Sequence, residues 1–396
     1  MLICAGNRTP HEDRHSGYNA SLSCSVLPSS PTTAARTLSW VPSSSEMTCH
    51  TSSSCWRRLR PCRNTRVRNE YRRQIQWVTD MYLDFVFHEE VYPLIEMSLK
   101  KYLANPTEMA FNSAHGVAFH RGLGTPLFPS SATPLTKYLD ADTIAEYAQS
   151  AYAKPSFAVV ANGASQEELS KWVNEFFTDT PSTPQHALKA EQTKYYGGEE
   201  RIAHKSGNAM VLAFPGSSSA TGAFYKPEIA VLAALLGGRS TIKWSPGFSL
   251  LSKATQQAPH MSIDTKSTIY SDAGLLTITM SGSASDIRTS APKVVEALKS
   301  VSENIDKELF AKAKALAKFK ELEFGQETQA GMELTGAGLV HGDKAYQIDE
   351  VAKKIDGVTE EQVKKAAQEA LKNKASVSTV GDLYMLPYAE EIGLQV

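Results

Sequence analysis

Two stretches of this chain follow the same order of residues, and this internal repeat constrains the fold more than any other feature. One begins at Leu139 and reads "LDADTIAEYAQSAYAKPSFAVVANG"; the other begins 216 residues later, at Ile355, and reads "IDGVTEEQVKKAAQEALKNKASVSTVGD". Each runs from an apolar residue and Asp, through a polar-capped helix, to a strand that ends at Gly163 or Gly381. A repeat of this length predicts two copies of one structural unit.

The segments around the repeats predict a duplicated α+β scaffold. Helices are expected where apolar residues recur every three to four positions, and strands where short apolar runs are bounded by turn residues. The predicted helices are "NPTEMAFNSAH" (capped by Asn105), "SQEELSKWVNEFF" (capped by Ser165), "KPEIAVLAALLGG" (closed by Gly237), "SAPKVVEALKSVSE", "DKELFAKAKALAKFKELEF" and "GMELTGAGLV". The predicted strands are "SFAVVANG", "ERIAHKSGNAMVLAFPGS" (a strand pair or one long strand) and the hairpin "TKSTIYSDAGLLTITMSGS".

The two copies differ in extent. The second begins near Gly197, and the matching start of the first would fall before residue 1. We therefore expect a partial first lobe over residues 81–180, a linker over 181–196 and a complete second lobe over 197–396. A sheet without its first strands has an unpaired edge and an uncovered face, so the first lobe should need another element to cover it.

Residues 1–80 differ in composition from the rest of the chain. They hold all five cysteines, 11 of the 15 arginines and no lysine, and their net charge is +6 against −7 for residues 81–396. We expect this segment to be disordered or non-native, since it offers little apolar surface to offset chain entropy. Three origins stay open: translated intron or shifted frame, a presequence with a linker, or a small domain.

The motif search predicts no catalytic, metal-binding or cofactor-binding residue, and no cofactor. His88 and Glu89 begin an H-E-x-x-H zinc motif, but Tyr92 stands where the second histidine belongs. His115 and His120 are five residues apart, which separates them by about 140° around a helix. They are interpreted as a helix-face histidine and a C-terminal cap, and His341 holds a similar place in the second copy.

Other motifs also favour structural roles. "GAGLVHG" (336–342) approaches the dinucleotide pattern G-x-G-x-x-G but follows a helix instead of a strand. The loop at 235–253, with Lys243 and Trp244, is interpreted either as a connection after a buried helix or as a binding loop for an extended peptide or a partner. The net charge of −1 gives no reason to expect nucleic acid, and no apolar run approaches the roughly 20 residues of a membrane span.

Three long strings resemble a known family. "NPTEMAFNSAHGVAFHRGLGTPLFPSS", "LLGGRSTIKWSPGFSLLSKA" and "TVGDLYMLPYAEEIGL" are similar to the core-protein members of the family of mitochondrial processing peptidases and pitrilysin-type (M16) metallopeptidases, over roughly residues 84–396. The resemblance implies an M16/LuxS-like fold of two similar lobes, each an antiparallel sheet backed by helices, with the first lobe incomplete. Active family members carry H-x-x-E-H early in the first lobe, a region without a counterpart here.

The resemblance also implies a role without catalysis. Core-protein members are structural subunits of ubiquinol–cytochrome c reductase. The implied partners are core protein 1, cytochrome b, cytochrome c1 and the Rieske protein. The implied location is peripheral, on the matrix side of the mitochondrial inner membrane, with no bound heme. Two alternatives stay open: a processing-peptidase-like subunit that lacks its zinc motif, and a truncated, non-functional product.

Overall fold

The computed structural model describes most of the chain beyond residue 95 and three strands before it. The described residues after the first strands are 96–126, 147, 153, 158–162, 165–176, 182–183, 193–222, 224–239, 247, 249–342 and 344–396. The helices are α4 (Pro106–Phe119), α6 (Gln166–Phe176), α7 (Pro227–Leu236), α8 (Leu250–Ala254), α9 (Ala284–Glu303), α10 (Lys307–Gln326), α11 (Thr328–Gly342), α12 (Ile348–Asp356) and α13 (Glu360–Lys372), with the 3-10 turn η2 (Gly122–Gly124). The strands are β1 (Leu2–Gly6), β2 (Leu22–Val26), β3 (Leu38–Trp40), β4 (Val159–Asn162), β5 (Gly198–Ala203), β6 (Asn208–Pro215), β7 (Ser262–Ile269), β8 (Gly274–Gly282) and β9 (Ser376–Gly381).

The larger sheet has five strands in the order β5-β9-β6-β8-β7. The pairs β6–β8, β6–β9 and β7–β8 are antiparallel, whereas β5 and β9 are parallel. The sheet is therefore mixed, which corrects the expectation of a wholly antiparallel sheet. A parallel pair needs a long crossover connection, and here all of the chain between β5 and β9 supplies it.

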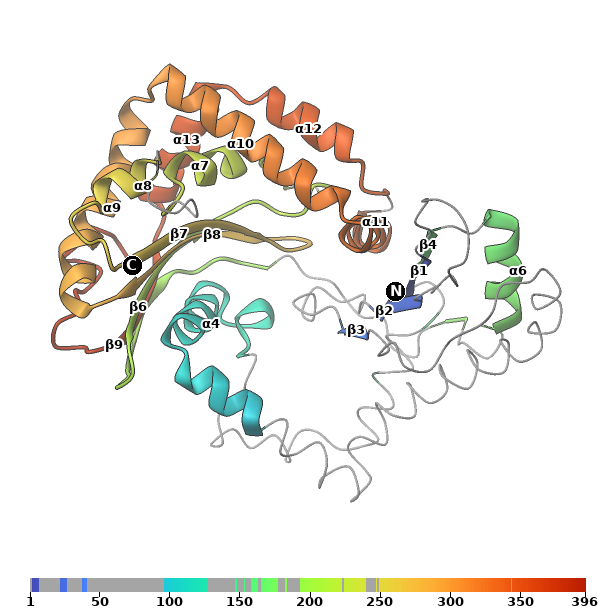
Figure 1. The fold of residues 1–396 in the computed structure, drawn as a ribbon, viewed down its shortest axis with the longest axis horizontal. Helices are drawn as coiled ribbons and strands as arrows, with labels where there is room; N and C mark the ends of the chain where they lie inside the picture. The colour runs from blue at the N-terminus through green and yellow to red at the C-terminus, as the bar shows by residue number, and fades with distance from the viewer. Residues whose placement is uncertain are drawn as a thin grey trace, which may run out of the picture.

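The central strand β6 is buried on both faces. Its side chains alternate, as in any strand: Met210, Leu212 and Phe214 join one hydrophobic cluster, and Ala209, Val211 and Ala213 join another. The first face carries large side chains and packs under the helices α7, α9, α10, α12 and α13, which all lie on the same side of the sheet (Figure 1). The second face carries two alanines beside Val211, so the element that covers it can approach the strand closely at the alanines.

Helix α4 is that covering element. Asn105 caps it by accepting hydrogen bonds from the backbone N–H groups of Thr107 and Glu108 at 3.1 and 3.4 Å, and Pro106 has the fixed φ that suits a first helical position. Ala110, Ala114 and Ala118 recur every four residues on one face and are fully buried. They pack with the alanines of β6 in a single cluster, and α4 lies under the sheet opposite the other helices (Figure 1).

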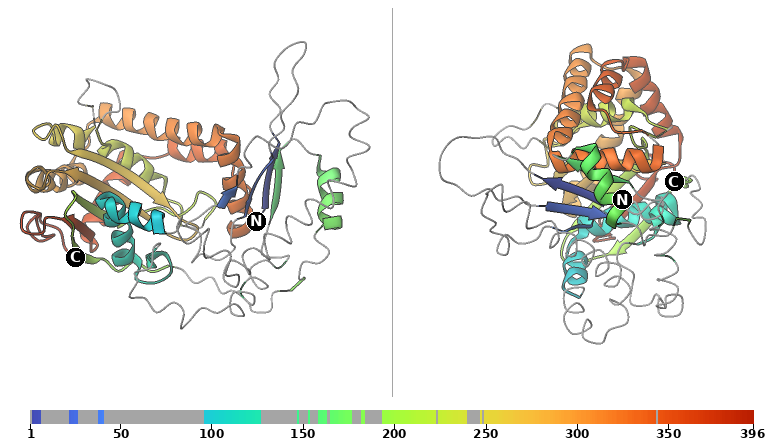
Figure 2. Two further views of the ribbon diagram at one scale, coloured as in Figure 1. Left: turned by 60° about the horizontal axis from the view of Figure 1, so that its bottom comes forward. Right: turned by 90° about the vertical axis from the view of Figure 1, so that its right-hand side faces the viewer.

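Helix α4 and its counterpart α11 each pack against the sheet of the other copy. Helix α4 falls within residues 81–180, which the sequence assigns to the first lobe, yet it contacts β9, β6, β5 and β8 of the second. Its counterpart in the second copy, α11, contacts β4 and β1 of the small sheet and lies beside those strands in both views of Figure 2. Each copy thus lends a helix to the sheet of the other, which covers faces that the repeat alone would leave open.

The small sheet has the order β3-β2-β1-β4. Its strands β1, β2 and β3 differ from the disorder expected for residues 1–80; the rest of that segment lies outside the described residues. The physical reason is that β4 offers unpaired backbone groups along one edge, and β1 pairs with them in parallel, with Leu2 opposite Val159. In the same way, β5 pairs in parallel with β9 in the larger sheet. The domain boundaries themselves stay a prediction.

Several expected elements are confirmed. Helix α6 follows Ser165, helix α7 ends at Gly237 with a φ of 61°, and the hairpin of β7 and β8 turns at residues 270–273. "ERIAHKSGNAMVLAFPGS" forms a strand pair, β5 and β6. The helix expected after Leu139 lies outside the described residues except at Tyr147. The two copies can therefore be compared through the elements on either side of it, where β4 matches β9 and α4 matches α11.

Candidate functional site

The histidine of greatest interest in the sequence is His115, and the structure buries it under the large sheet. Its Nδ1 lies 2.8 Å from the carbonyl oxygen of Phe111 and its Nε2 lies 2.7 Å from the hydroxyl of Tyr270. Since a carbonyl only accepts, Nδ1 carries the proton and donates to Phe111, and Nε2 accepts from Tyr270. The ring therefore ties α4 to the hairpin of β7 and β8, and both of its nitrogens serve contacts within the fold.

Burial sets the protonation of this pair. Desolvation lowers the pKa of His115 below its usual value, against a smaller opposing effect of the hydrogen bond to Phe111, and burial raises the pKa of Tyr270 to about 12. Both groups are therefore neutral at pH 7. Desolvation also lowers the pKa of His341, with Asp272 acting in the opposite direction, but this residue is exposed, so its effect is smaller than that of the buried His115.

We predict that this burial makes the stability of the chain depend on pH. Because the pKa of His115 is lower in the folded state than in the unfolded state, the unfolded state binds the proton first as pH falls below about 6.5. The free energy of unfolding should therefore be constant with respect to this group above that pH and decrease below it. His115→Gln should reduce the slope between pH 6.5 and 5 in urea unfolding, and His115→Gln/His341→Gln should reduce it further; an unchanged slope in both variants would contradict the assignment.

The remaining candidates that lie in the described part of the chain do not form a site. His120 is the C-terminal cap of α4: its backbone N–H donates to Gly116, and its ring stacks on Tyr196 with centroids 4.2 Å apart. His88, Glu89, Tyr92, Lys243 and Trp244 lie outside the described residues. Within the part of the chain that the structure describes, no group of three His, Cys, Asp or Glu side chains is placed to hold a metal ion. "GAGLVHG" lies inside α11, which agrees with a structural role.

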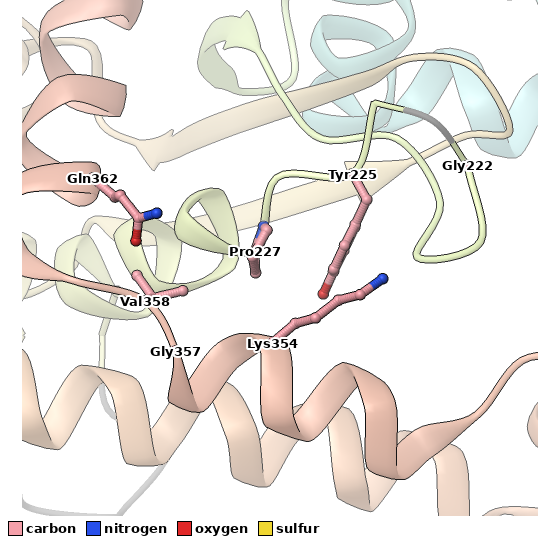
Figure 3. Close-up of a pocket in the computed structure, with 7 residues that line it drawn as sticks. All are labelled: Gly222, Tyr225, Pro227, Lys354, Gly357, Val358 and Gln362. Carbon is pink, nitrogen blue, oxygen red and sulfur yellow. The ribbon is translucent and has the colours of Figure 1, made fainter.

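A cavity of about 370 Å³ lies between α12, the start of α13 and the loop before α7 (Figure 3). Tyr225, Lys354 and Gln362 line it. Lys354 Nζ lies 5.1 Å from the ring centroid of Tyr225 and donates to the carbonyl of Ala220, and Gln362 Oε1 accepts from the backbone N–H of Thr359. Lys354 and Gln362 thus serve contacts within the fold, and the cavity holds no nucleophile beside a base.

A chain of side-chain hydrogen bonds, called the polar ladder below, joins helix α4 to the strands β9 and β5. Ser378 on β9 donates to Ser113 on α4 at 2.8 Å, and Ser113 donates to Glu200 on β5 at 2.5 Å. Ser378 and Ser113 are buried. Buried hydroxyls are costly without partners, so the ladder favours one register of α4 on the sheet over its neighbours.

Arg201 on β5 holds the segment that follows β9. Its guanidinium donates to the carbonyls of Leu383, Leu386 and Pro387, each at 2.9 Å, and Nη1 lies 3.3 Å from Glu199 Oε1. Its charge also lies 3.7 Å from the ring centroid of Tyr388. The five donors of a guanidinium suit such a set of acceptors, so one side chain fixes residues 382–388 against the sheet.

Large apolar side chains remain exposed in two places. Leu316, Phe319 and Phe324 lie on α10. Tyr384, Met385 and Tyr388 lie on the segment held by Arg201, where Tyr384 is 97% exposed. Exposed apolar groups in clusters indicate binding of another protein more than catalysis. The described part of the chain therefore offers surfaces for partners and no catalytic arrangement.

Comparison with known proteins defines the class to which this architecture belongs. Residues 138–316 match the peptidase M16 inactive domain. One chain of the solved structure titled "Complex III2 from Candida albicans, Inz-5 bound" has the same fold, with a TM-score of 0.70 at 15% identity over 83% of this chain and 78% of that chain. The chain is thus an M16-like protein, and the matched domain is an inactive one, which confirms the expected fold and the expectation of a non-peptidase member.

Two relatives with similar sequences identify the family within this M16-like class. Cytochrome b-c1 complex subunit 2 of Neurospora crassa is 44% identical over 316 residues, which span 80% of this chain and 68% of the relative. The corresponding protein of Schizosaccharomyces pombe is 31% identical over 328 residues, which span 81% of this chain and 73% of the relative. The chain belongs to the family of mitochondrial cytochrome b-c1 complex subunit 2. None of the described helices is both long and apolar enough to cross a membrane.

Sequence reasoning missed the role of Arg201, although a signal was present. Glu199 and Arg201 are two residues apart in a predicted strand, so they point to the same face and form a charge pair there. The partners of Arg201 are backbone carbonyl oxygens more than 180 positions later. Every residue has such a carbonyl, so the sequence does not indicate which ones accept a hydrogen bond. The same reason hides the ladder of Ser113 and Ser378, whose residue types are common on surfaces.

Proposed function

We propose that this chain is a non-catalytic structural subunit of the mitochondrial cytochrome b-c1 complex, ubiquinol–cytochrome c reductase, in the position of subunit 2. The similarity to the Neurospora crassa subunit, at 44% identity over 316 residues, carries this proposal. The described residues add support, since they contain clustered exposed apolar side chains and no metal-binding cluster. The chain contributes to the respiratory chain by stabilising the assembled complex.

The proposed partners are core protein 1, cytochrome b, cytochrome c1 and the Rieske protein. The proposed location is the matrix side of the mitochondrial inner membrane, where the chain is held by these subunits. An obligate interface of this kind buries about 2,000–5,000 Å², which is enough to hold a subunit whose described helices include no membrane span. The acidic balance of residues 81–396 disfavours direct binding to anionic lipid.

Complementation tests the proposal. Fungal cells that lack their own subunit 2 should recover ubiquinol–cytochrome c reductase activity in mitochondrial membranes when they produce this chain, because the activity depends on assembly. Cells with an empty vector and cells with the native subunit are the two controls. If the chain accumulates in mitochondria and the activity stays at the level of the empty vector, the proposed function is wrong.

A second function has one observation in its favour. The chain is 26% identical over 324 residues to a mitochondrial-processing peptidase subunit alpha-2 of Dictyostelium discoideum. A peptidase-type role would require zinc, which binds through convergent His, Glu or Cys ligands. Presequence cleavage by the purified chain that depends on zinc would replace the structural proposal.

A further inference from the structure

The cavity between α12, the start of α13 and the loop before α7 has three side chains in its wall that can donate hydrogen bonds. The lining residues are Gly222, Tyr225, Pro227, Lys354, Gly357, Val358 and Gln362, and Lys354 is the one charged side chain among them. The volume of about 370 Å³ falls within the range of small-molecule sites, about 300–1,000 Å³. The cavity therefore admits a small organic molecule, and the polar side chains of the wall determine its class.

The cap of α13 fixes which end of the Gln362 amide faces the cavity. Gln362 Oε1 accepts from the backbone N–H of Thr359 at 2.8 Å, and the backbone N–H of Gln362 donates in return to Thr359 Oγ1. A backbone N–H only donates, so the amide atom beside it is the oxygen. The nitrogen, Nε2, lies on the other side of the amide and points toward Pro227 (Figure 3). It donates to no other group in the described part of the chain, so this donor is available to a ligand.

Tyr225 and Lys354 bring two further donors to the cavity, across Pro227 from Gln362 (Figure 3). Lys354 Nζ lies 5.1 Å from the ring centroid of Tyr225 and donates one hydrogen bond, of 3.4 Å, to the carbonyl of Ala220. An ammonium group has three donors, so two remain. Burial raises the pKa of Tyr225 above its usual value, so the hydroxyl keeps its proton at pH 7. This hydroxyl has no hydrogen-bond partner among the described residues.

The nearest ion pairs leave the charge of Lys354 without a close partner. Glu350 and Lys354 both line a smaller adjoining cavity of about 110 Å³, but Glu350 Oε2 lies 2.5 Å from Lys344 Nζ. Asp356, two residues after Lys354, lies 2.5 Å from Lys318 Nζ through its Oδ2. Each of these carboxylates thus has its own lysine.

Three more carboxyl groups lie near the cavity and outside its wall. Glu321 on α10 and Glu228 on α7 are close enough to Tyr225 to add to the rise of its pKa. Burial raises the pKa of Glu321 itself, which favours its neutral form. Glu361 precedes Gln362 and is exposed. None of the three lines the cavity, so a ligand inside it meets one positive charge and side-chain donors first.

We propose that this cavity binds a small organic carboxylate. The carboxylate accepts hydrogen bonds from Lys354 Nζ and Tyr225 Oη, with Gln362 Nε2 as a donor on the facing wall, and its apolar part packs against Pro227 and Val358. An ionised carboxylate only accepts, and charge-assisted hydrogen bonds are among the strongest. A cationic ligand would meet the like charge of Lys354 instead. The inference goes beyond the proposed structural role and does not depend on it.

Titration of the purified full-length chain with three probes tests the class of ligand. Hexanoate has a carboxylate and an apolar part, hexylamine has the opposite charge on a chain of the same length, and inorganic phosphate is an anion without an apolar part. Calorimetry and ligand-detected NMR measure the binding. We expect hexanoate to bind with a dissociation constant on the order of 1 mM, as suits a ligand of so few atoms, and the other two probes at least about tenfold more weakly.

Two variants locate the site. Lys354→Met removes the charge and keeps an apolar side chain. Gln362→Glu keeps an oxygen for the backbone N–H of Thr359 and replaces the cavity-facing donor with a negative charge. Each should weaken hexanoate binding at least about tenfold, as expected when a charge-assisted hydrogen bond is lost. Lys365→Met is the matched control, because Lys365 is an exposed lysine on α13 outside the cavity wall, and it should bind hexanoate as the wild type does.

Thermal unfolding of each variant should match the wild type, which shows that the fold is kept. Hexanoate binding that does not saturate, or equal affinity for hexylamine, would overturn the inference. Stronger binding of phosphate than of hexanoate would also overturn it, because the apolar part would then contribute nothing. Unchanged affinity in both Lys354→Met and Gln362→Glu would show that hexanoate binds elsewhere. None of these results bears on assembly into the cytochrome b-c1 complex, which complementation tests separately.

Discussion

Replacing Arg201 with methionine should lower the free energy of unfolding by about 3–5 kcal/mol, the range measured when one partner of a buried ion pair is removed. The side chains of Arg201 and Glu199 are 12% and 15% exposed, so solvent compensates little for the loss. The variant leaves the carboxylate of Glu199 without its counter-ion and three carbonyl oxygens without their donor. Residues 382–394 should then detach from the sheet more readily.

Two measurements check this result. Urea unfolding of the purified chain gives the change in free energy, and hydrogen exchange gives the protection of the amides of residues 382–394. Arg288→Met is the matched control, because Arg288 is exposed and donates one long hydrogen bond, of 3.4 Å, to the carbonyl of Met385. It should change stability by less than about 0.5 kcal/mol. An equal effect of the two replacements would show that the contacts of Arg201 contribute little.

The double variant Arg201→Met/Glu199→Gln separates the two causes. Glutamine removes the uncompensated charge and keeps an oxygen that accepts from the backbone N–H of Ala389, as Glu199 Oε2 does. The double variant should therefore be more stable than Arg201→Met alone, with an interaction energy of about 0.5–3 kcal/mol. Simple additivity of the two single variants would indicate that the lost carbonyl contacts dominate.

Replacing Ala114 with leucine should destabilise the second lobe by about 1–3 kcal/mol, because the contact between α4 and β6 has no room for three further carbon atoms. Ala114 is fully buried in a cluster with Ala209 and Ala213. The larger side chain would push α4 away from the sheet. That movement would also stretch the hydrogen bonds of Ser113 and His115 on the same helix.

The readout should come from the strand that α4 covers. Hydrogen exchange of the β6 amides in Ala114→Leu should show lower protection than in the wild type, although residue 114 lies in the segment that the sequence assigns to the first lobe. Ala104→Leu is the control, because Ala104 is exposed just before the α4 cap. If β6 is equally protected in both variants, α4 does not belong to the packing unit of the second lobe.

The sequence predicts individual elements well where the signal is local. Asn105 marks a helix start through a side chain that accepts nearby backbone donors, and Gly237 marks a helix end through its positive φ. The repeat at Leu139 and Ile355 indicates the duplicated plan. Such signals depend on neighbours within about one helical turn, so tertiary context rarely overrides them.

The sequence does not predict which sheet a helix covers. The run "NAMVLAFP" is apolar on both faces of β6, which indicates a buried strand, and its alanines indicate a close neighbour. Helix α4 presents small residues at Ala110, Ala114 and Ala118, but either sheet could receive that face. The choice depends on the path of the whole chain. For the same reason the sequence could not show that β1 pairs with β4 in parallel.

Mass spectrometry of the purified cytochrome b-c1 complex tests the central claim most directly. The complex is isolated through a tag on cytochrome c1 from cells in which this chain replaces subunit 2, and peptides are quantified against those of cytochrome b. We predict equal amounts of this chain and cytochrome b after washing in high salt, as expected for a subunit held by a large interface. Loss of the chain from complexes that still contain cytochrome b would contradict its role as a structural subunit.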